Sequence, residues 1–337
     1  MIREAINAMV DGRSLTMEEA AQSMSDIMDG DATPAQIGAF ATALRMKGET
    51  LDEIVGMAQA MRDRSLHVDV DGLVVDTCGT GGDSSGTFNI STTVGFVVAG
   101  AEVTVAKHGN RAASGATGSA DVLEELGVKI DLGPDGVRRC LEEVGFGFMF
   151  AQTFHPAMRF AAVPRREIGI RTIFNTLGPL MNPAGATAQV FGVADPGLAD
   201  VVAQFLGTQH TTHALIVHGR DGLDEISLGD TTDVWELKDG EVSTYSVAPA
   251  DFGLGRINND HLKVASVAGS ANKVRGVLGG ESGPARDVVL ANAAGALLAA
   301  DKVATLRDGV TIAARSIDSG QARARLDALV KLSQSLA

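Results

Sequence analysis

The chain has 337 residues, of which 42 are acidic and 28 basic, so its formal net charge is −14 at pH 7. This length can bury one or two substantial hydrophobic cores, and two domains are the better expectation. Nucleic-acid binding needs basic surfaces and often aromatic stacking platforms, but aromatic residues make up only 4% of this acidic chain. We therefore do not expect a nucleic-acid-binding protein.

The cysteines and the apolar segments indicate the cellular compartment of the protein. Cys78 and Cys140 are the only cysteines, and they lie far apart without metal-ligand spacing. This usage argues against a disulfide framework or a zinc site and favours a reducing compartment. The sequence contains no signal-peptide pattern and no run of about eighteen apolar residues, so we expect no membrane association and a cytoplasmic location.

The first 66 residues predict a bundle of four helices. Thr16, Thr33 and Thr50 each precede a Glu or Gln by three residues, which is the capping-box pattern of a helix start. A bundle of this size has a thin core. Later helices within about residues 160–185, or a second subunit, are expected to complete it.

The rest of the chain changes to short apolar strands that alternate with helices, which indicates an α/β domain with a mostly parallel sheet. Residues 233–238 and 241–247 flank an Asp-Gly pair and predict an antiparallel hairpin with a type I′ turn. We therefore predict a small α-helical domain over residues 1–70 and a large α/β domain over residues 71–337. The parallel strands are predicted at residues 73–76, 103–106, 128–131, 146–150, 189–193 and 213–218.

Residues 76–92, DTCGTGGDSSGTFNIST, form a glycine-rich stretch between a predicted strand and a predicted helix. Glycine N–H groups can approach a phosphate closely, and the N-terminus of the helix adds partial positive charge. A bare glycine cluster can also be a tight turn, and the stretch matches neither of the two common phosphate-loop patterns. We nevertheless interpret it as a polyphosphate cradle, because a second segment repeats its organisation.

That second segment, KHGNRAASGATGSAD at residues 107–121, also follows a β-branched run and precedes a helical pattern. Two strand-loop-helix units side by side place both loops at the carboxyl ends of parallel strands. Open α/β sheets bind their ligands at this edge. The two segments together therefore favour the phosphate interpretation.

Four arginines lie between Arg159 and Arg171 in an otherwise acidic chain. They could form a solvated helix face. The Gly-Pro and Asn-Pro turns that follow favour a carboxylate or phosphate site instead, because a planar guanidinium can hold a carboxylate with two parallel hydrogen bonds.

Asp224 and Glu225 follow the last predicted parallel strand. Most adjacent carboxylates belong to exposed acidic loops. Beside two predicted phosphate loops, however, these hard oxygen ligands predict a Mg²⁺ site.

Taken together, these segments resemble the anthranilate phosphoribosyltransferases of tryptophan biosynthesis, in order and over nearly the whole chain. The resemblance implies a small helical domain, a large α/β domain and a homodimer formed through the helical domains. It also implies transfer of the 5-phosphoribosyl group from 5-phosphoribosyl diphosphate (PRPP) to the amine of anthranilate, with Mg²⁺ and release of diphosphate. The matching segments are Gly79–Asp83, Asn89–Thr92, Lys107–Arg111, Gly118–Asp121, Phe154–Pro156 with Arg165, Leu177–Leu180 and Asp224-Glu225.

The resemblance also assigns residues to each ligand. Two Mg²⁺ ions are expected, on Ser91, Asp224 and Glu225. The PRPP residues are Gly79, Gly82, Asp83, Thr87, Asn89, Ile90, Ser91, Thr92, Lys107, His108, Gly109, Asn110, Arg111, Ala112, Ala113, Ser114, Gly115 and Ser119. The anthranilate residues are Gly79, Asn110, His155, Arg165 and Pro179.

The amine of anthranilate is neutral at pH 7, so the reaction needs no strong base, and positioning of the reactants should dominate. His108 is the one candidate acid–base residue, and a structural or substrate-lining role is the preferred interpretation. A pyrimidine nucleoside phosphorylase has the same architecture but uses inorganic phosphate and does not need the acidic pair. A non-catalytic nucleic-acid-binding relative would need a basic surface.

Overall fold

The computed structural model describes residues 1–112 and 117–336, which form two compact units. Unit 1 comprises Met1–His67 and Ala151–Pro183, and unit 2 comprises Val68–Phe150 and Ala184–Ala337. In the described part of the chain, no helix combines the length and the apolar character needed to cross a membrane.

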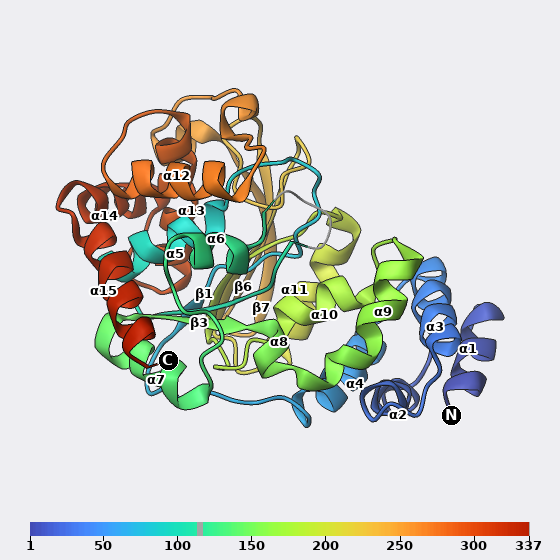
Figure 1. Cartoon of the computed structure of the whole chain (residues 1–337). Helices are drawn as coiled ribbons and strands as arrows, with labels where there is room; N and C mark the ends of the chain where they lie inside the picture. The colour runs from blue at the N-terminus through green and yellow to red at the C-terminus, as the bar shows by residue number, and fades with distance from the viewer. Residues whose placement is uncertain (113–116, 337) are drawn as a thin grey trace. The chain divides into compact units, whose positions relative to one another are not determined.

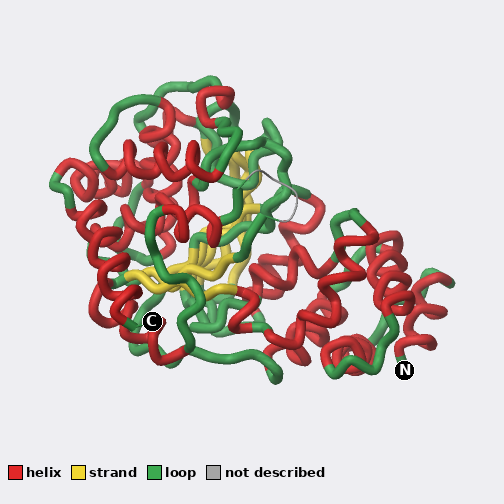
Figure 2. Tube along the Cα trace, viewed as in Figure 1, coloured by secondary structure: helices red, strands yellow, loops and turns green. Residues whose placement is uncertain are grey.

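Unit 1 contains only helices and loops (Figures 1 and 2). The four predicted N-terminal helices are confirmed, and Thr16, Thr33 and Thr50 each form the predicted capping box. α9 packs against α2 and α3, and α10 packs against α3 and α4. The elements are α1 (Ile2–Val10), α2 (Met17–Met28), α3 (Pro34–Lys47), α4 (Leu51–Arg62), α8 (Ala151–Phe154), a 3-10 helix (Pro156–Met158), α9 (Arg159–Ile168) and α10 (Ile173–Leu180).

Unit 2 is built on one seven-stranded sheet with the order β3-β2-β1-β4-β5-β6-β7. The first five strands of this order run parallel, and β6 and β7 add an antiparallel hairpin, which confirms the predicted fold class. Asp239 and Gly240 have φ angles of +51° and +84°, as a type I′ turn requires. The strands are β1 (Val75–Asp76), β2 (Val105–Gly109), β3 (Phe146–Phe150), β4 (Ala188–Gly192), β5 (His213–Gly219), β6 (Thr232–Lys238) and β7 (Glu241–Val247).

The helices of unit 2 cover this sheet. α5 lies beside α13 and α15 and packs against both (Figure 1), while α13 also contacts β4 and β5. Their buried side chains form the core, in which the Phe96 and Phe146 rings stack with centroids 4.3 Å apart. The helices are α5 (Ile90–Gly100), α6 (Ser119–Glu125), α7 (Pro134–Val144), α11 (Ala199–Gly207), α12 (Val267–Leu278), α13 (Pro284–Ala299), α14 (Leu306–Asp318) and α15 (Gln321–Ser335), with 3-10 helices at Pro196–Leu198, Pro249–Phe252 and Asn259–Leu262.

The strand predicted at residues 128–131 is wrong, because these residues form an irregular segment. Val128 and Ile130 are buried, as in a strand. The backbone of this segment, however, is held by the C-terminal helix α15 instead of a neighbouring strand, since Lys129 N–H donates to Ser333 Oγ at 3.1 Å. Burial alternates along residues 128–131 although no strand pairs with them, because the segment lies against α15.

Candidate active site

The first glycine-rich loop leaves the carboxyl end of β1 and enters α5, as predicted. Gly81 and Gly82 have φ angles of +63° and +71°, which favour glycine strongly. Gly79 needs glycine for space, because a Cβ there would lie 3.0 Å from the Gly192 carbonyl oxygen and 3.1 Å from an Asp224 carboxylate oxygen. The loop thus combines glycines required by backbone conformation with one required by close approach.

Hydrogen bonds fix this loop to the end of β4. Thr80 N–H donates to the Gly192 carbonyl at 2.8 Å, and Thr80 Oγ1 accepts from Ala194 N–H at 3.1 Å. Further along the loop, Asp83 Oδ1 accepts from Ser85 N–H at 3.0 Å and from Ser85 Oγ at 2.9 Å. The loop therefore has a defined shape that is held by its own polar side chains.

Asn89 stands at the start of α5 and is fixed by Ser270 of α12. Its backbone N–H donates to Ser270 Oγ at 3.0 Å, and its Oδ1 accepts from Ser270 Oγ at 2.8 Å and from Thr117 Oγ1 at 2.9 Å. With Oδ1 engaged twice, the Nδ2 group is the part of Asn89 that can donate to a phosphate. Sequence analysis missed Ser270, because a lone serine in a distant helix carries no motif.

Lys107 brings a buried cation to the same place. Its side chain is only 1% exposed, and Nζ donates to the Thr77 carbonyl and to Ser91 Oγ, both at 3.1 Å. Thr77 in turn donates through Oγ1 to the Ser91 carbonyl at 3.0 Å. The predicted residues Lys107 and Ser91 therefore meet at the N-terminus of α5. His108 follows in the same strand and is buried too, but successive strand residues point to opposite faces.

Asp224 and Glu225 lie in the loop after β5 and are half-buried. Asp224 Oδ2 accepts from Gly81 N–H at 2.6 Å, which joins the acidic pair to the first loop. Burial raises the pKa of Asp224 well above its ordinary value, and the nearby Asp83 and Glu225 carboxylates raise it further. Burial also raises the pKa of Glu225 to about 8, although Lys107 opposes the shift. Folding therefore gathers more negative charge here than the neighbouring protein groups neutralise.

This excess of negative charge fits a divalent cation. Within residues 1–112 and 117–336, no three His, Cys, Asp or Glu side chains are grouped as metal ligands. The protein would thus supply two carboxylates and the Ser91 hydroxyl. Mg²⁺ is commonly bound in this way, through one or two carboxylates with substrate phosphates and water completing the octahedron.

The second loop leaves β2 and is closed by Asp121 of α6. Asp121 Oδ2 accepts from the N–H groups of Ala112 and Gly118, both at 3.0 Å, and Oδ1 accepts from Arg111 at 2.9 Å. Burial alone would raise the pKa of Asp121, but these donors outweigh it and hold the pKa below its usual value. Of the residues assigned to PRPP, Ala113, Ser114 and Gly115 lie outside the described residues.

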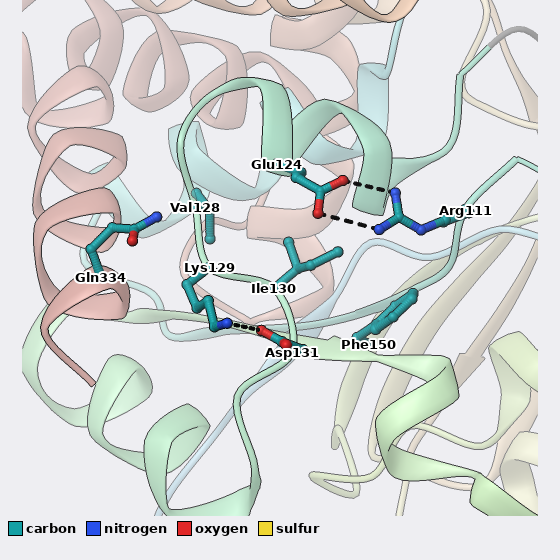
Figure 3. Close-up of a pocket in the computed structure, with 8 residues that line it drawn as sticks. All are labelled: Arg111, Glu124, Val128, Lys129, Ile130, Asp131, Phe150 and Gln334. Carbon is teal, nitrogen blue, oxygen red and sulfur yellow. Dashed lines mark hydrogen bonds and ion pairs between the residues drawn. The ribbon is translucent and has the colours of Figure 1, made fainter. Parts of the chain in front are cut away.

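A cavity of about 290 Å³ lies beside this loop (Figure 3). Arg111 points across it toward Glu124, with N–O distances of 2.8 and 3.3 Å, and Lys129 pairs with Asp131 at 3.0 Å. The Arg111 guanidinium also lies 5.7 Å from the centroid of the Phe150 ring. Both cations that line the cavity are thus already paired. The lining residues are Arg111, Glu124, Val128, Lys129, Ile130, Asp131, Phe150 and Gln334.

Each remaining predicted PRPP residue has a definite place in unit 2. The backbone of Ile90 begins α5, and its side chain is buried in the core together with Thr92. Ser119 begins α6 and its Oγ donates to the Asn110 carbonyl at 3.4 Å. The others belong to the first loop (Gly79, Gly82, Asp83, Thr87, Asn89) or to β2 and the residues that follow it (Lys107, His108, Gly109, Asn110, Arg111, Ala112).

Three residues assigned to anthranilate belong to unit 1. His155 is buried with Nδ1 2.7 Å from Ser65 Oγ, and Pro179 lies inside α10. Arg165 is half-buried in α9 with its guanidinium 5.5 Å from the Phe174 ring centroid. Burial lowers the pKa of Arg165. A desolvated guanidinium of this kind binds a carboxylate more strongly than one in water.

Two family models match this chain, one in its N-terminal helical part and one in its α/β part. Residues 3–65 match the helical bundle domain of a glycosyl transferase family, and residues 71–323 match the a/b domain of the same family. Together these matches cover most of the chain.

Comparison with individual proteins narrows the family. Anthranilate phosphoribosyltransferases from Dehalococcoides mccartyi and Chloroflexus aurantiacus are 52% and 56% identical, over 99% or more of this chain and 99% of each relative. The crystal structure of the enzyme from Thermus thermophilus matches with a TM-score of 0.92 at 40% identity, covering 98% of this chain and 99% of that one. The Saccharomyces cerevisiae enzyme in complex with PRPP and Mg matches with a TM-score of 0.92 at 26% identity, covering 99% and 98%. The chain therefore belongs to this glycosyl transferase family and, within it, to the anthranilate phosphoribosyltransferases.

Proposed function

We propose that the chain transfers the 5-phosphoribosyl group of PRPP to the amino group of anthranilate. The products are N-(5-phospho-β-D-ribosyl)anthranilate and diphosphate, in the second step of tryptophan biosynthesis from chorismate. The observation that carries this proposal is identity of 52–56% to relatives of that name over essentially the whole chain. The two phosphate-type loops of unit 2 supply the chemical support.

The leaving diphosphate needs donors and positive charge. The first loop bends at Gly82, whose left-handed backbone suits close approach to a phosphate, α5 adds its N-terminus, and Lys107 adds a buried ammonium. We assign PRPP to this edge of the sheet, on the residues predicted from the sequence. Such preorganised donors stabilise charge that develops in the transition state without any rearrangement.

Asp224, Glu225 and Ser91 would hold Mg²⁺, and we expect two ions in the complex with PRPP. Bound Mg²⁺ would neutralise charge on the leaving diphosphate. The support is local: the two carboxylates stand close to Asp83 in a half-buried place, where a cation would relieve their repulsion. The Saccharomyces cerevisiae relative was solved with PRPP and Mg.

Anthranilate brings a neutral amine, so the chain has to orient the nucleophile instead of deprotonating it. We assign the anthranilate carboxylate to Arg165, with Gly79, Asn110, His155 and Pro179 as further contacts. Arg165→Ala should raise the KM for anthranilate ten- to a hundredfold, since a charge-assisted pair is worth about 1.5–3 kcal/mol. The KM for PRPP should stay nearly unchanged.

Arg159→Ala is the matched control for Arg165, because Arg159 is another arginine of α9 that lies over an aromatic ring, 4.4 Å from the Phe160 centroid, yet is exposed. It should leave both KM values near wild type. If Arg165→Ala changes the KM for PRPP instead, this arginine binds phosphate and the assignment is wrong.

We further propose that the protein is a cytoplasmic homodimer formed through unit 1. α1 and α3 pack together and expose apolar side chains, with Val10 71% and Met46 83% accessible. Both cysteines are free thiols, as a reducing compartment requires. Light scattering of the wild type and of Val10→Glu/Met46→Glu should report a dimer and a monomer respectively.

The decisive experiment is the PRPP-dependent loss of anthranilate fluorescence, measured with and without Mg²⁺. We expect loss of fluorescence only when both PRPP and Mg²⁺ are present. Phosphorolysis of a pyrimidine nucleoside without activity on anthranilate would overturn the proposal in favour of the phosphorylase alternative.

A further inference from the structure

Asn292 is a buried amide in the middle of an apolar helix. α13 contributes eleven buried residues to the core of unit 2, and Asn292 is the one with a polar side chain, only 2% exposed. A buried amide destabilises a core unless hydrogen bonds replace its contacts with water. The contacts of Asn292 therefore indicate what this residue does.

Two of the three hydrogen bonds of the Asn292 side chain go to one residue, Ile226. Asn292 Oδ1 accepts from Ile226 N–H at 2.8 Å, and Nδ2 donates to the Ile226 carbonyl at 2.9 Å. The second Nδ2 hydrogen goes to the Val288 carbonyl within the helix, also at 2.9 Å. Because one backbone group is a donor and the other an acceptor, an amide side chain is suited to bind both at once.

Ile226 follows directly after the acidic pair Asp224-Glu225, in a loop without regular secondary structure. α13 also makes room for its side chain, since a Cβ at Gly295 would lie 2.7 Å from Ile226 Cδ1. On the other side of the loop, Gly192 at the end of β4 lets the Asp224 backbone approach closely. The acidic pair is thus held between the end of a strand and one polar side chain of α13.

This support matters because the neighbouring carboxylates repel one another. Asp83, Asp224 and Glu225 are acidic groups in a half-buried place, and once a cation requires them to be ionised together, their repulsion favours any movement of the loop that separates them. Two hydrogen bonds to consecutive backbone groups resist such a movement, as a partner strand would.

We propose that Asn292 is a positioning residue for the metal-binding pair, fixing the backbone next to Glu225 so that both carboxylates face the cation together. This inference rests on the proposed assignment of Mg²⁺ to Asp224 and Glu225. It predicts that Asn292 acts on metal affinity, although its side chain bonds to the backbone of Ile226 and Val288 and to neither carboxylate.

The test replaces Asn292 by Leu, which has the same branched shape and number of side-chain heavy atoms but cannot form hydrogen bonds to Ile226. Binding of Mn²⁺ in the presence of PRPP, followed by electron paramagnetic resonance, should weaken at least tenfold. The Mg²⁺ concentration for half-maximal activity should rise by a similar factor, with most of kcat recovered at saturating Mg²⁺. Hydrogen exchange of the segment 222–228 should become faster.

Ser316→Ala is the matched control, because it removes another buried side chain-to-backbone bond in unit 2, from Ser316 Oγ to the Val97 carbonyl at 2.7 Å. It should lower the melting temperature without changing Mn²⁺ affinity. If Asn292→Leu does not fold, Asn292→Ser, which can bond one of the two groups, is measured in its place and should weaken Mn²⁺ binding less.

Unchanged Mn²⁺ affinity in a folded Asn292 variant would overturn the proposal and leave a purely structural role. The double variant Asp224→Asn/Glu225→Gln, measured in parallel, separates this result from failure of the metal assignment. Wild-type Mn²⁺ affinity in the double variant would show that the metal binds elsewhere.

Discussion

Two buried carboxylate sites, one in each unit, differ in whether folding supplies their partners. In unit 1, Glu53 is fully buried, and its oxygens accept from Leu15 N–H at 2.8 Å, Lys47 Nζ at 2.9 Å and Thr50 N–H at 2.9 Å. In unit 2, Asp224 and Glu225 are half-buried beside further negative charge. A carboxylate that finds its partners during folding stabilises the fold. One that folding leaves short of positive charge is available to a ligand.

The largest expected effect follows from neutralising the acidic pair without changing its shape. Asp224→Asn/Glu225→Gln should reduce kcat about a thousandfold, since a metal that stabilises the leaving group contributes about 4 kcal/mol to the transition state. The melting temperature should stay the same or rise, because the change removes repulsion between buried charges. Steady-state kinetics at saturating Mg²⁺ and calorimetry measure the two effects. Retained turnover, or a large loss of stability, would mean that these carboxylates stabilise the fold, as Glu53 does.

The reverse result is expected for Glu53→Gln. Lys47 would then lie buried without its counter-charge, and breaking such a pair costs about 3 kcal/mol of unfolding free energy. The kcat of the folded variant should match wild type. Thermal unfolding gives the stability change, and Glu143→Gln, which breaks an exposed pair with Arg139, should cost less than about 1 kcal/mol. A similar loss of unfolding free energy in both variants would mean that burial does not strengthen the pair of Glu53 with Lys47.

Local patterns in the sequence predicted what depends on neighbouring residues. The T-x-x-E spacing predicted the capping box of Thr50 and Glu53, and the structure confirms it. The same pattern could not show that Glu53 also binds Leu15, because that contact joins residues 38 positions apart. Ser270 and Asn292 were missed for the same reason. Each is a single polar residue whose role depends on which loop the fold places against it.

The mostly parallel sheet and the places of both glycine-rich loops could be predicted from alternating strand and helix patterns, because such patterns repeat locally. The segment 128–131 shows the limit of this reasoning, since burial alternates there without a neighbouring strand. An alternating pattern reports which side chains are buried and leaves open what buries them.

His155 offers a third case, a buried group that unit 1 keeps neutral. Burial lowers its pKa to about 4, although a hydrogen bond to the Met181 backbone opposes the shift. The unfolded chain binds a proton near pH 6.5, so stability is complete above that pH and is lost as the pH falls toward 4. At pH 5 the loss should be about 2 kcal/mol. Melting temperatures of the wild type and of His155→Gln between pH 4.5 and 7.5 measure it, and the variant should lose less stability on acidification. If the melting temperatures of the two proteins fall in parallel as the pH is lowered, groups other than His155 cause the loss of stability in acid.

Asp121 tests whether the two classes of carboxylate stay separate at the edge of the site. Like Glu53, it has partners from folding: the N–H groups of Ala112 and Gly118, and Arg111. Unlike Glu53, it closes a loop that we assign to PRPP. Asp121→Asn keeps one acceptor oxygen and turns an NH₂ group toward the remaining donors, which should cost about 1 kcal/mol. We therefore expect the KM for PRPP to rise about fivefold with kcat nearly unchanged.

Asp135→Asn is the control, because it makes the same change at an exposed pair with Arg138, and it should alter neither the KM for PRPP nor kcat. A hundredfold loss of kcat in Asp121→Asn with normal KM would instead place Asp121 with Asp224 and Glu225, because only a charge used in the transition state lowers kcat in this way.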